Sequence, residues 1–104
     1  MDALQKYSQD HFLERAIGYL RAGYPTMSLA CEPLEDFGRE GMGMAFALGI
    51  ERECDVIRYL EMLLIWSQRR GAAMPDWAVE LLNTSQVPPE KKVDLIYSRM
   101  LREL

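Results

Sequence analysis

Catalysis or metal binding in this chain would depend on few reactive side chains, and His11 limits the choice most because it is the single histidine. A di-iron centre in a helical bundle needs a Glu-x-x-His pair on each of two helices, and zinc usually takes four closely spaced cysteine or histidine ligands. His11, Cys31 and Cys54 match neither pattern. The sequence therefore predicts no metal site, and we expect His11 to be a surface or capping residue.

The two cysteines, Cys31 and Cys54, lack the setting of a catalytic nucleophile. A reactive thiol needs a nearby base and a positive environment, whereas Cys54 lies between Glu53 and Asp55. We expect both thiols to be free and buried, Cys54 as a small residue inside a helix. Whether they lie close together stays open, because sequence does not fix their separation.

Two further patterns could suggest ligand sites. Gly38, Gly41 and Gly43 have the wrong order for a dinucleotide fingerprint, and no Gly-Lys-Ser/Thr sequence follows them as in a phosphate-binding loop. The carboxylates between Glu32 and Glu40 lack the spacing of an EF-hand calcium loop. We interpret the glycines as sites of close helix packing and the carboxylates as a solvated face, and we predict no catalytic, cofactor-binding or metal-binding residues.

The charge balance argues against nucleic acid as the main partner. The formal net charge is −4 and the pI is about 5.0, so the chain as a whole repels phosphate backbones. Arg69–Arg70 beside Trp66, with Lys91–Lys92, could form a small basic patch only if the segments that carry them were neighbours. A small helical DNA-binding regulator therefore remains an alternative.

Composition indicates one globular domain spanning residues 1–104, with 49% hydrophobic and 27% charged residues. No basic-then-apolar leader opens the sequence, and the methionines and unpatterned cysteines suit a reducing compartment, so we expect a cytoplasmic protein. The most apolar stretch, Val56 to Trp66, contains Arg58 and Glu61 and is too short to span a bilayer. We therefore expect no membrane insertion.

Apolar residues recur at helical spacing along the chain, and no stretch alternates with period two. The sequence predicts an all-α fold: a compact single-domain bundle of about five helices around a central apolar helix. We expect Thr26 to Pro33 to be an apolar connection. The expected helices are Ser8–Ala22, Leu34–Leu48, a central helix opening at Glu51–Asp55 and ending near Arg70, Pro75–Leu82, and a last helix beginning at Pro89.

Some apolar residues fall off the expected core stripes and are candidates for a partner-binding surface. Methionine-rich surfaces adapt to partners, and a contiguous exposed apolar patch usually marks an interface. The alternatives are that the connection and second helix fold over these residues, or that the same surface joins copies of this chain. The candidate partner-binding residues are Tyr24, Met27, Leu29, Met42, Phe46 and Met74.

Three segments carry a resemblance to a known group of proteins. They are Phe12-Leu13 with Tyr19-Leu20-Arg21 and Tyr24-Pro25, the junction from Ala47 to Tyr59, and Pro75-Asp76-Trp77-Ala78 with Leu81-Leu82 and Lys92-Val93. This pattern resembles small helical bacterial proteins of unknown function that are often encoded beside type VI secretion effectors. The resemblance implies a non-enzymatic accessory of a secreted effector or toxin: an adaptor, chaperone or co-effector, or alternatively an immunity protein. It implies no catalytic residues and no cofactor, and its partner is another protein.

Overall fold

The computed structural model describes residues 3–69 and 74–103, and every regular element in these ranges is an α-helix. The predicted all-α class is confirmed. The helices are α1 (Ala3–Gly23), α2 (Pro25–Ala30), α3 (Leu34–Ala47), α4 (Glu53–Arg69), α5 (Asp76–Leu82) and α6 (Pro89–Glu103).

Prolines and glycines lie at several helix boundaries, and the sequence predicted those at Gly49 and Pro89 but not the helix that begins at Pro25. Pro25 opens α2 and Pro89 opens α6, at positions where a missing amide hydrogen leaves no helical bond unmade. Gly49 adopts a φ of 83° after α3, where the Gly49 and Ile50 amides donate to the Phe46 and Ala45 carbonyls. This is a Schellman cap, and its left-handed residue favours glycine.

One predicted connection is a helix. Pro25–Ala30 forms the short helix α2, where the sequence predicted an irregular apolar segment from Thr26 to Pro33. Six residues are too few to display a helical apolar period, so the pattern could not distinguish this helix from a loop. The buried Ser28 hydroxyl donates to the Leu20 carbonyl at 3.1 Å and ties α2 to the end of α1.

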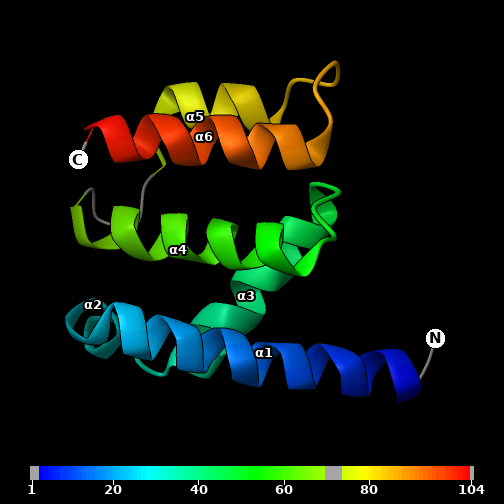
Figure 1. Ribbon diagram of the computed structural model, residues 1–104, viewed down its shortest axis with the longest axis vertical. Helices are drawn as coiled ribbons and strands as arrows, with labels where there is room; N and C mark the ends of the chain where they lie inside the picture. Colours follow the sequence, from blue (N-terminus) through cyan, green and yellow to red (C-terminus); the bar gives the residue numbers. More distant parts are fainter. Residues whose placement is uncertain (1–2, 70–73, 104) are drawn as a thin grey trace.

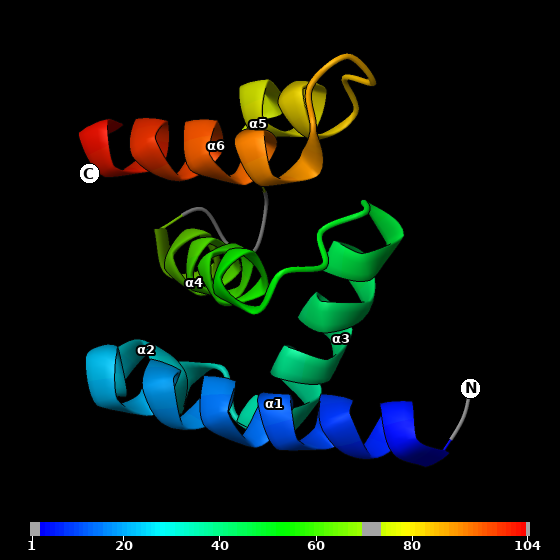
Figure 2. The same ribbon diagram turned by 45° about the vertical axis from the view of Figure 1, so that its right-hand side comes forward.

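The helices form a flat body, with α4 in the middle (Figure 1). The Cα positions span 37 × 34 × 17 Å. Helices α1 and α2 pack on one edge of α4, and α6 packs on the opposite edge with α5 against it. Helix α3 crosses one side of α4, and no helix within residues 3–69 and 74–103 covers the other side (Figure 2). The central helix of the prediction is therefore α4.

Helix α3 approaches α4 closely at a glycine. A methyl group at Gly41 would overlap the Leu60 side chain and lie 3.2 Å from Leu63 Cδ1. The sequence placed Met42 off the expected core stripes. The structure contradicts this: Met42 is 5% exposed, whereas Met44 is 46% exposed, because α3 packs on α1 and α4 with Met42 on its buried stripe.

None of the helices in residues 3–69 and 74–103 combines the length and the hydropathy that crossing a membrane requires.

Candidate functional site

The structure separates the predicted partner-binding residues. Tyr24, Met27 and Leu29 lie together at the start of α2 and within it, beside the C-terminal half of α4. Met74 is partly buried and just precedes α5. Phe46 is 37% exposed near the end of α3, toward the N-terminal end of α4 (Figure 1). Met42 is a core residue and offers no surface to a partner.

The side of α4 that no helix covers presents residues seven positions apart. Cys54, Glu61 and Gln68 share one stripe, because seven residues complete about two helical turns. Cys54 and Gln68 are exposed, whereas the sequence predicted a buried Cys54. The correction follows from topology, since α1, α3 and α6 cover the other faces of α4 and leave this stripe without a helix.

Glu61 is the exception on this stripe, because its side chain is only 3% exposed. The Tyr24 hydroxyl donates to Glu61 Oε2 at 2.8 Å, and the Tyr97 hydroxyl donates to the same oxygen at 3.4 Å. Tyr24 precedes α2 and Tyr97 belongs to α6, so the two side chains reach Glu61 from opposite edges of α4. A buried carboxylate thus joins the two halves of the molecule.

Arg58 and Tyr19 complete this surface. The Arg58 guanidinium pairs with Asp94 on α6 and lies 5.6 Å from the centre of the Tyr97 ring. Tyr19 lies near the end of α1 and is 51% exposed. We name Tyr19, Tyr24, Arg58, Glu61 and Tyr97 together the tyrosine face.

The electrostatics of the tyrosine face keep its phenols neutral. Burial raises the pKa of Tyr24, and the hydrogen bond to Glu61 and the charge of that carboxylate raise it further. Burial also raises the pKa of Tyr97, again with the Glu61 charge as the next cause. Both hydroxyls are therefore donors at neutral pH, and neither is a candidate base.

The other two buried charges among the described residues have different partners. Asp55, 1% exposed, accepts a hydrogen bond from Arg52 Nε at 2.7 Å. The Lys92 ammonium donates at 2.9 Å to the Leu82 carbonyl at the end of α5. Lys92 is 8% exposed, so it cannot contribute to the basic patch considered from the sequence, and Trp66 of that patch is also buried. Arg69 and Arg70 lie outside the described side chains.

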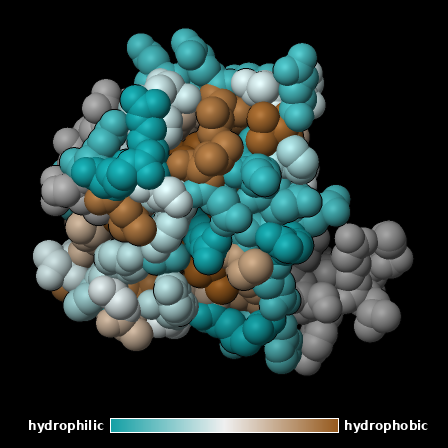
Figure 3. Space-filling model, turned by 45° about the horizontal axis from the view of Figure 1, so that its top comes forward, coloured by the Kyte–Doolittle hydropathy of each residue, from teal (hydrophilic) through white to brown (hydrophobic). Residues whose placement is uncertain are grey.

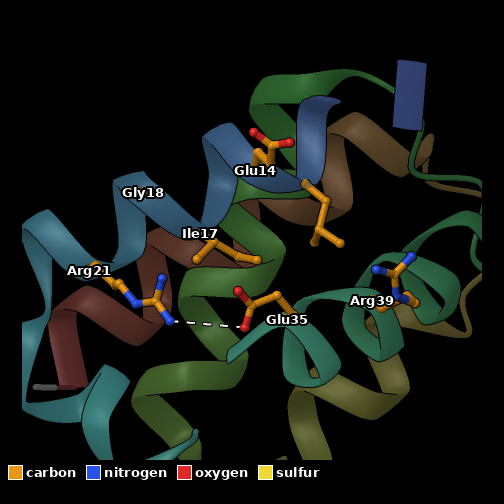
Figure 4. A pocket seen from close by; sticks show the side chains of 7 residues that line it. Glu14, Ile17, Gly18, Arg21, Glu35 and Arg39 are labelled. Carbon is orange, nitrogen blue, oxygen red and sulfur yellow. Dashed lines mark ion pairs between the residues drawn. The ribbon is translucent and has the colours of Figure 1, made fainter. Parts of the chain in front are cut away.

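A shallow cleft of about 440 Å³ lies between α1 and α3 (Figure 4). Its floor includes Leu13 and Ile17, and its rim carries Glu14, Arg39 and the weak Arg21–Glu35 ion pair. Arg21 also pairs with Glu32 at 3.2 Å. The acidic and basic groups here are mixed, which indicates a solvated ionic surface and does not favour an anion-binding or cation-binding pocket.

The residues weighed for chemistry are dispersed. His11 is exposed on α1, Cys31 is half-buried near Ser67, and Cys54 is exposed on α4. Across the described residues, no three histidine, cysteine, aspartate or glutamate side chains are grouped so that they could hold a metal ion.

Exposed hydrophobic side chains are spread over the surface in separate patches (Figure 3). Two are aliphatic residues associated with the same elements as the tyrosine face. Leu29 on α2 is 74% exposed, and Leu101 on α6 is 51% exposed and lies one turn after Tyr97. Val79 is 41% exposed and lies on α5, a helix that carries no residue of the tyrosine face.

Comparisons of the chain with protein-family models, curated proteins and solved structures found no match. We therefore argue function from the geometry of the described residues. Sequence reasoning singled out Tyr24 but did not connect it with Tyr97 and Glu61. The one feature of the sequence that distinguished Glu61 was its position as an acidic residue inside the most apolar stretch, Val56 to Trp66.

Proposed function

We propose that the protein is a non-enzymatic protein–protein interaction module that binds its partner through the tyrosine face. The observation that carries this proposal is the buried Glu61 carboxylate on α4, to which Tyr24 and Tyr97 donate from two different segments while Arg58 lies against the Tyr97 ring. Among the described helices, α1, α2, α3 and α6 pack on α4, and they leave the side opposite α3 uncovered (Figure 2).

The residue types of this surface support binding. Tyrosine and arginine are enriched at the centres of interfaces, where they dominate the binding energy. A tyrosine ring contributes a large rigid contact area with few rotatable bonds, and its hydroxyl adds a polar contact. Tyr24 and Tyr97 are already held by Glu61, so a partner would meet side chains that lose little further freedom.

The size of the surface is sufficient. A specific interface takes about 800 Å² from each partner. The broad side of the molecule measures 37 × 34 Å between Cα positions, so such an area fits on it. Leu29 and Leu101 would add apolar burial, and covering a leucine side chain fully gains about 1.5–3 kcal/mol.

The context of the proposed partner comes from the sequence resemblance. The resemblance to small bacterial proteins that are often encoded beside type VI secretion effectors favours a cytoplasmic accessory of a bacterial effector or toxin, as an adaptor, chaperone or co-effector. An immunity protein that neutralises a toxin is the alternative, and the two differ in whether the complex preserves or blocks toxin activity.

The test is affinity capture of the tagged protein from cells of its source organism, followed by identification and quantification of bound proteins. The wild type is compared with Leu29→Glu, which places a charge on the exposed surface of α2, the helix that follows Tyr24. Val79→Glu is the matched control, since it changes an exposed aliphatic residue to the same charge on α5. Phe46→Glu tests the part of the sequence-predicted partner surface that lies on α3.

We expect a stoichiometric partner with the wild type, Val79→Glu and Phe46→Glu, and loss of that partner with Leu29→Glu. Equal loss with Phe46→Glu alone would move the interface to α3. Capture of only this chain would favour self-association, and recovery of DNA with salt-sensitive binding would favour the regulator alternative.

A further inference from the structure

Glu61 differs from the other buried charges in its partners. Asp55 has the Arg52 guanidinium, and the Lys92 ammonium has the carbonyl end of α5. Glu61 has only two phenolic hydroxyls, and no ion pair of the described residues includes it. Arg58, one turn earlier on α4, is directed at Asp94. A buried carboxylate with neutral partners keeps an unmet attraction for a cation.

The two oxygens of Glu61 are used unequally. Both tyrosine hydroxyls donate to Oε2, and no hydrogen bond of the described residues reaches Oε1. No fully buried side-chain oxygen or nitrogen in the described part of the chain lacks a hydrogen-bond partner. Oε1 therefore accounts for part of the small exposed area of Glu61.

We infer that Glu61 Oε1, framed by Tyr24 and Tyr97, is the binding site for a lysine side chain supplied by the partner protein. This inference rests on the proposed function, because it names the partner group that the tyrosine face recognises. The ammonium would donate to Oε1 while its alkyl stem passes between the tyrosine rings.

The chemistry of the site favours an ammonium. The exposed part of Glu61 is small, and an ammonium is a compact charge on a slender stem, whereas a guanidinium is a broad plane that needs two aligned acceptors. The face of a tyrosine ring attracts a cation, as the Arg58 guanidinium over the Tyr97 ring shows, and the Tyr24 ring offers a second such face. The net charge of −4 also favours encounter with a basic partner surface.

The variant Glu61→Gln isolates this role from folding. The glutamine carbonyl oxygen can accept from both tyrosine hydroxyls, so the links to α2 and α6 remain. The charge is removed, and a buried charge without an ionic partner does not help stability. We expect the melting temperature of Glu61→Gln to equal or exceed that of the wild type, while cation binding is lost.

The experiment is an NMR titration of the full ¹⁵N-labelled chain with N-acetyl-lysine methylamide. The same molecule acetylated at Nε is the neutral control probe. We expect saturable shifts of the amides at Tyr24, Glu61 and Tyr97 with the charged probe only, and an affinity at least ~10-fold weaker for Glu61→Gln. Glu53→Gln is the matched control, because it removes an exposed carboxylate of α4 and should leave the affinity unchanged.

Three outcomes would overturn the inference: no saturable shift with the charged probe, equal affinity for Glu61→Gln, or tighter binding of N-acetyl-arginine methylamide. Partner capture by the tyrosine face does not depend on this titration. A failed titration with intact, Leu29-dependent capture would reject the lysine and leave the proposed function standing. Failed capture together with a positive titration would reject the proposed function and leave the lysine-binding site standing.

Discussion

The Glu61 carboxylate on α4 is hydrogen-bonded to tyrosines from two other parts of the chain. Tyr24 and Tyr97 stand 37 and 36 positions away in the sequence, yet both donate to one oxygen of Glu61. Hydrogen bonds to a buried charged group contribute more than neutral ones and respond strongly to removal of the donor. The tyrosine hydroxyls should therefore contribute measurably to stability.

Replacing Tyr24 by phenylalanine should lower the free energy of unfolding by about 1–3 kcal/mol, since it leaves the buried acceptor with one weaker donor. Tyr97→Phe should cost less, because its bond is 3.4 Å against 2.8 Å. Urea denaturation monitored by circular dichroism measures both. Tyr19→Phe is the control and should be neutral; an equal loss with Tyr19→Phe would contradict the assigned role of Glu61.

Alkaline pH should destabilise the fold through the same tyrosines. Burial raises the pKa of Tyr24, Tyr59 and Tyr97 in the folded state. A raised pKa leaves stability unchanged below the unfolded value of about 10 and lowers it as pH rises above that value, because the unfolded chain releases the proton first. The free energy of unfolding should therefore fall above pH ~10.

The decline above that pH should be shallower in Tyr24→Phe, which has one fewer shifted phenol. Urea unfolding on either side of the unfolded tyrosine pKa measures it. Identical pH profiles for the wild type and Tyr24→Phe would contradict the raised Tyr24 pKa.

Individual site residues were only partly predictable from sequence. Tyr24 and Leu29 were candidates from sequence, and the structure leaves Tyr24 partly exposed and Leu29 exposed. Met42, Cys54 and Glu61 were not, because their exposure depends on which helices cover which side of α3 and α4. Helical spacing gives the relative direction of side chains but does not say which directions meet another helix.

Among the helices, α3 shows most clearly how local sequence and packing interact. Gly41 and Gly43 occupy the same helix two positions apart. A methyl group at Gly41 would overlap Leu60, whereas a methyl group at Gly43 would meet open space. Gly41 is therefore needed for close packing of α3 on α4, whereas no neighbouring side chain requires a glycine at position 43.

Gly41→Ala should destabilise the protein by about 1–3 kcal/mol, because α3 and α4 must move apart or Leu60 must repack. Gly43→Ala should stabilise it by about 0.5–1 kcal/mol, because alanine restricts the unfolded chain and favours the helix. Thermal unfolding of the two variants side by side is the measurement. The same sign for both would contradict the α3–α4 contact at Gly41.

Helix boundaries were predicted correctly where a proline or a glycine marks the end of a helix. Pro89 and Gly49 mark boundaries by backbone chemistry that packing does not override. Helix α2 was missed because its six residues are held by contacts to distant groups, including the Tyr24–Glu61 bond and the Ser28 bond to Leu20. Tertiary contacts of this kind leave no period in the sequence.

At the scale of the whole molecule, α4 joins two groups of helices. Helices α1 and α2 pack on one edge of it, α3 crosses one side, and α6 packs on the opposite edge with α5 against it. Side-chain contacts also link these helices to α4: Arg15–Glu53, Arg58–Asp94 and the two tyrosines on Glu61. The broad distribution of apolar residues around the helix at Val56–Trp66 predicted that this helix is central. It did not predict which side of the helix would lack a packed neighbour.

The flat shape explains why one side chain on α4 could govern partner binding. The body is 17 Å deep between Cα positions, so a helix at its centre still reaches the surface on the side opposite α3. Glu61 therefore lies within the core and at a candidate interface together. A change there can alter binding while the fold is kept.

The central claim is that Glu61 is retained for binding, and quantitative affinity capture with Glu61→Gln tests it most directly. The account predicts that this variant unfolds at the same or a higher temperature than the wild type and captures at least ~10-fold less partner, while Val79→Glu captures the full amount. Full capture of the partner by a folded Glu61→Gln protein would contradict the account.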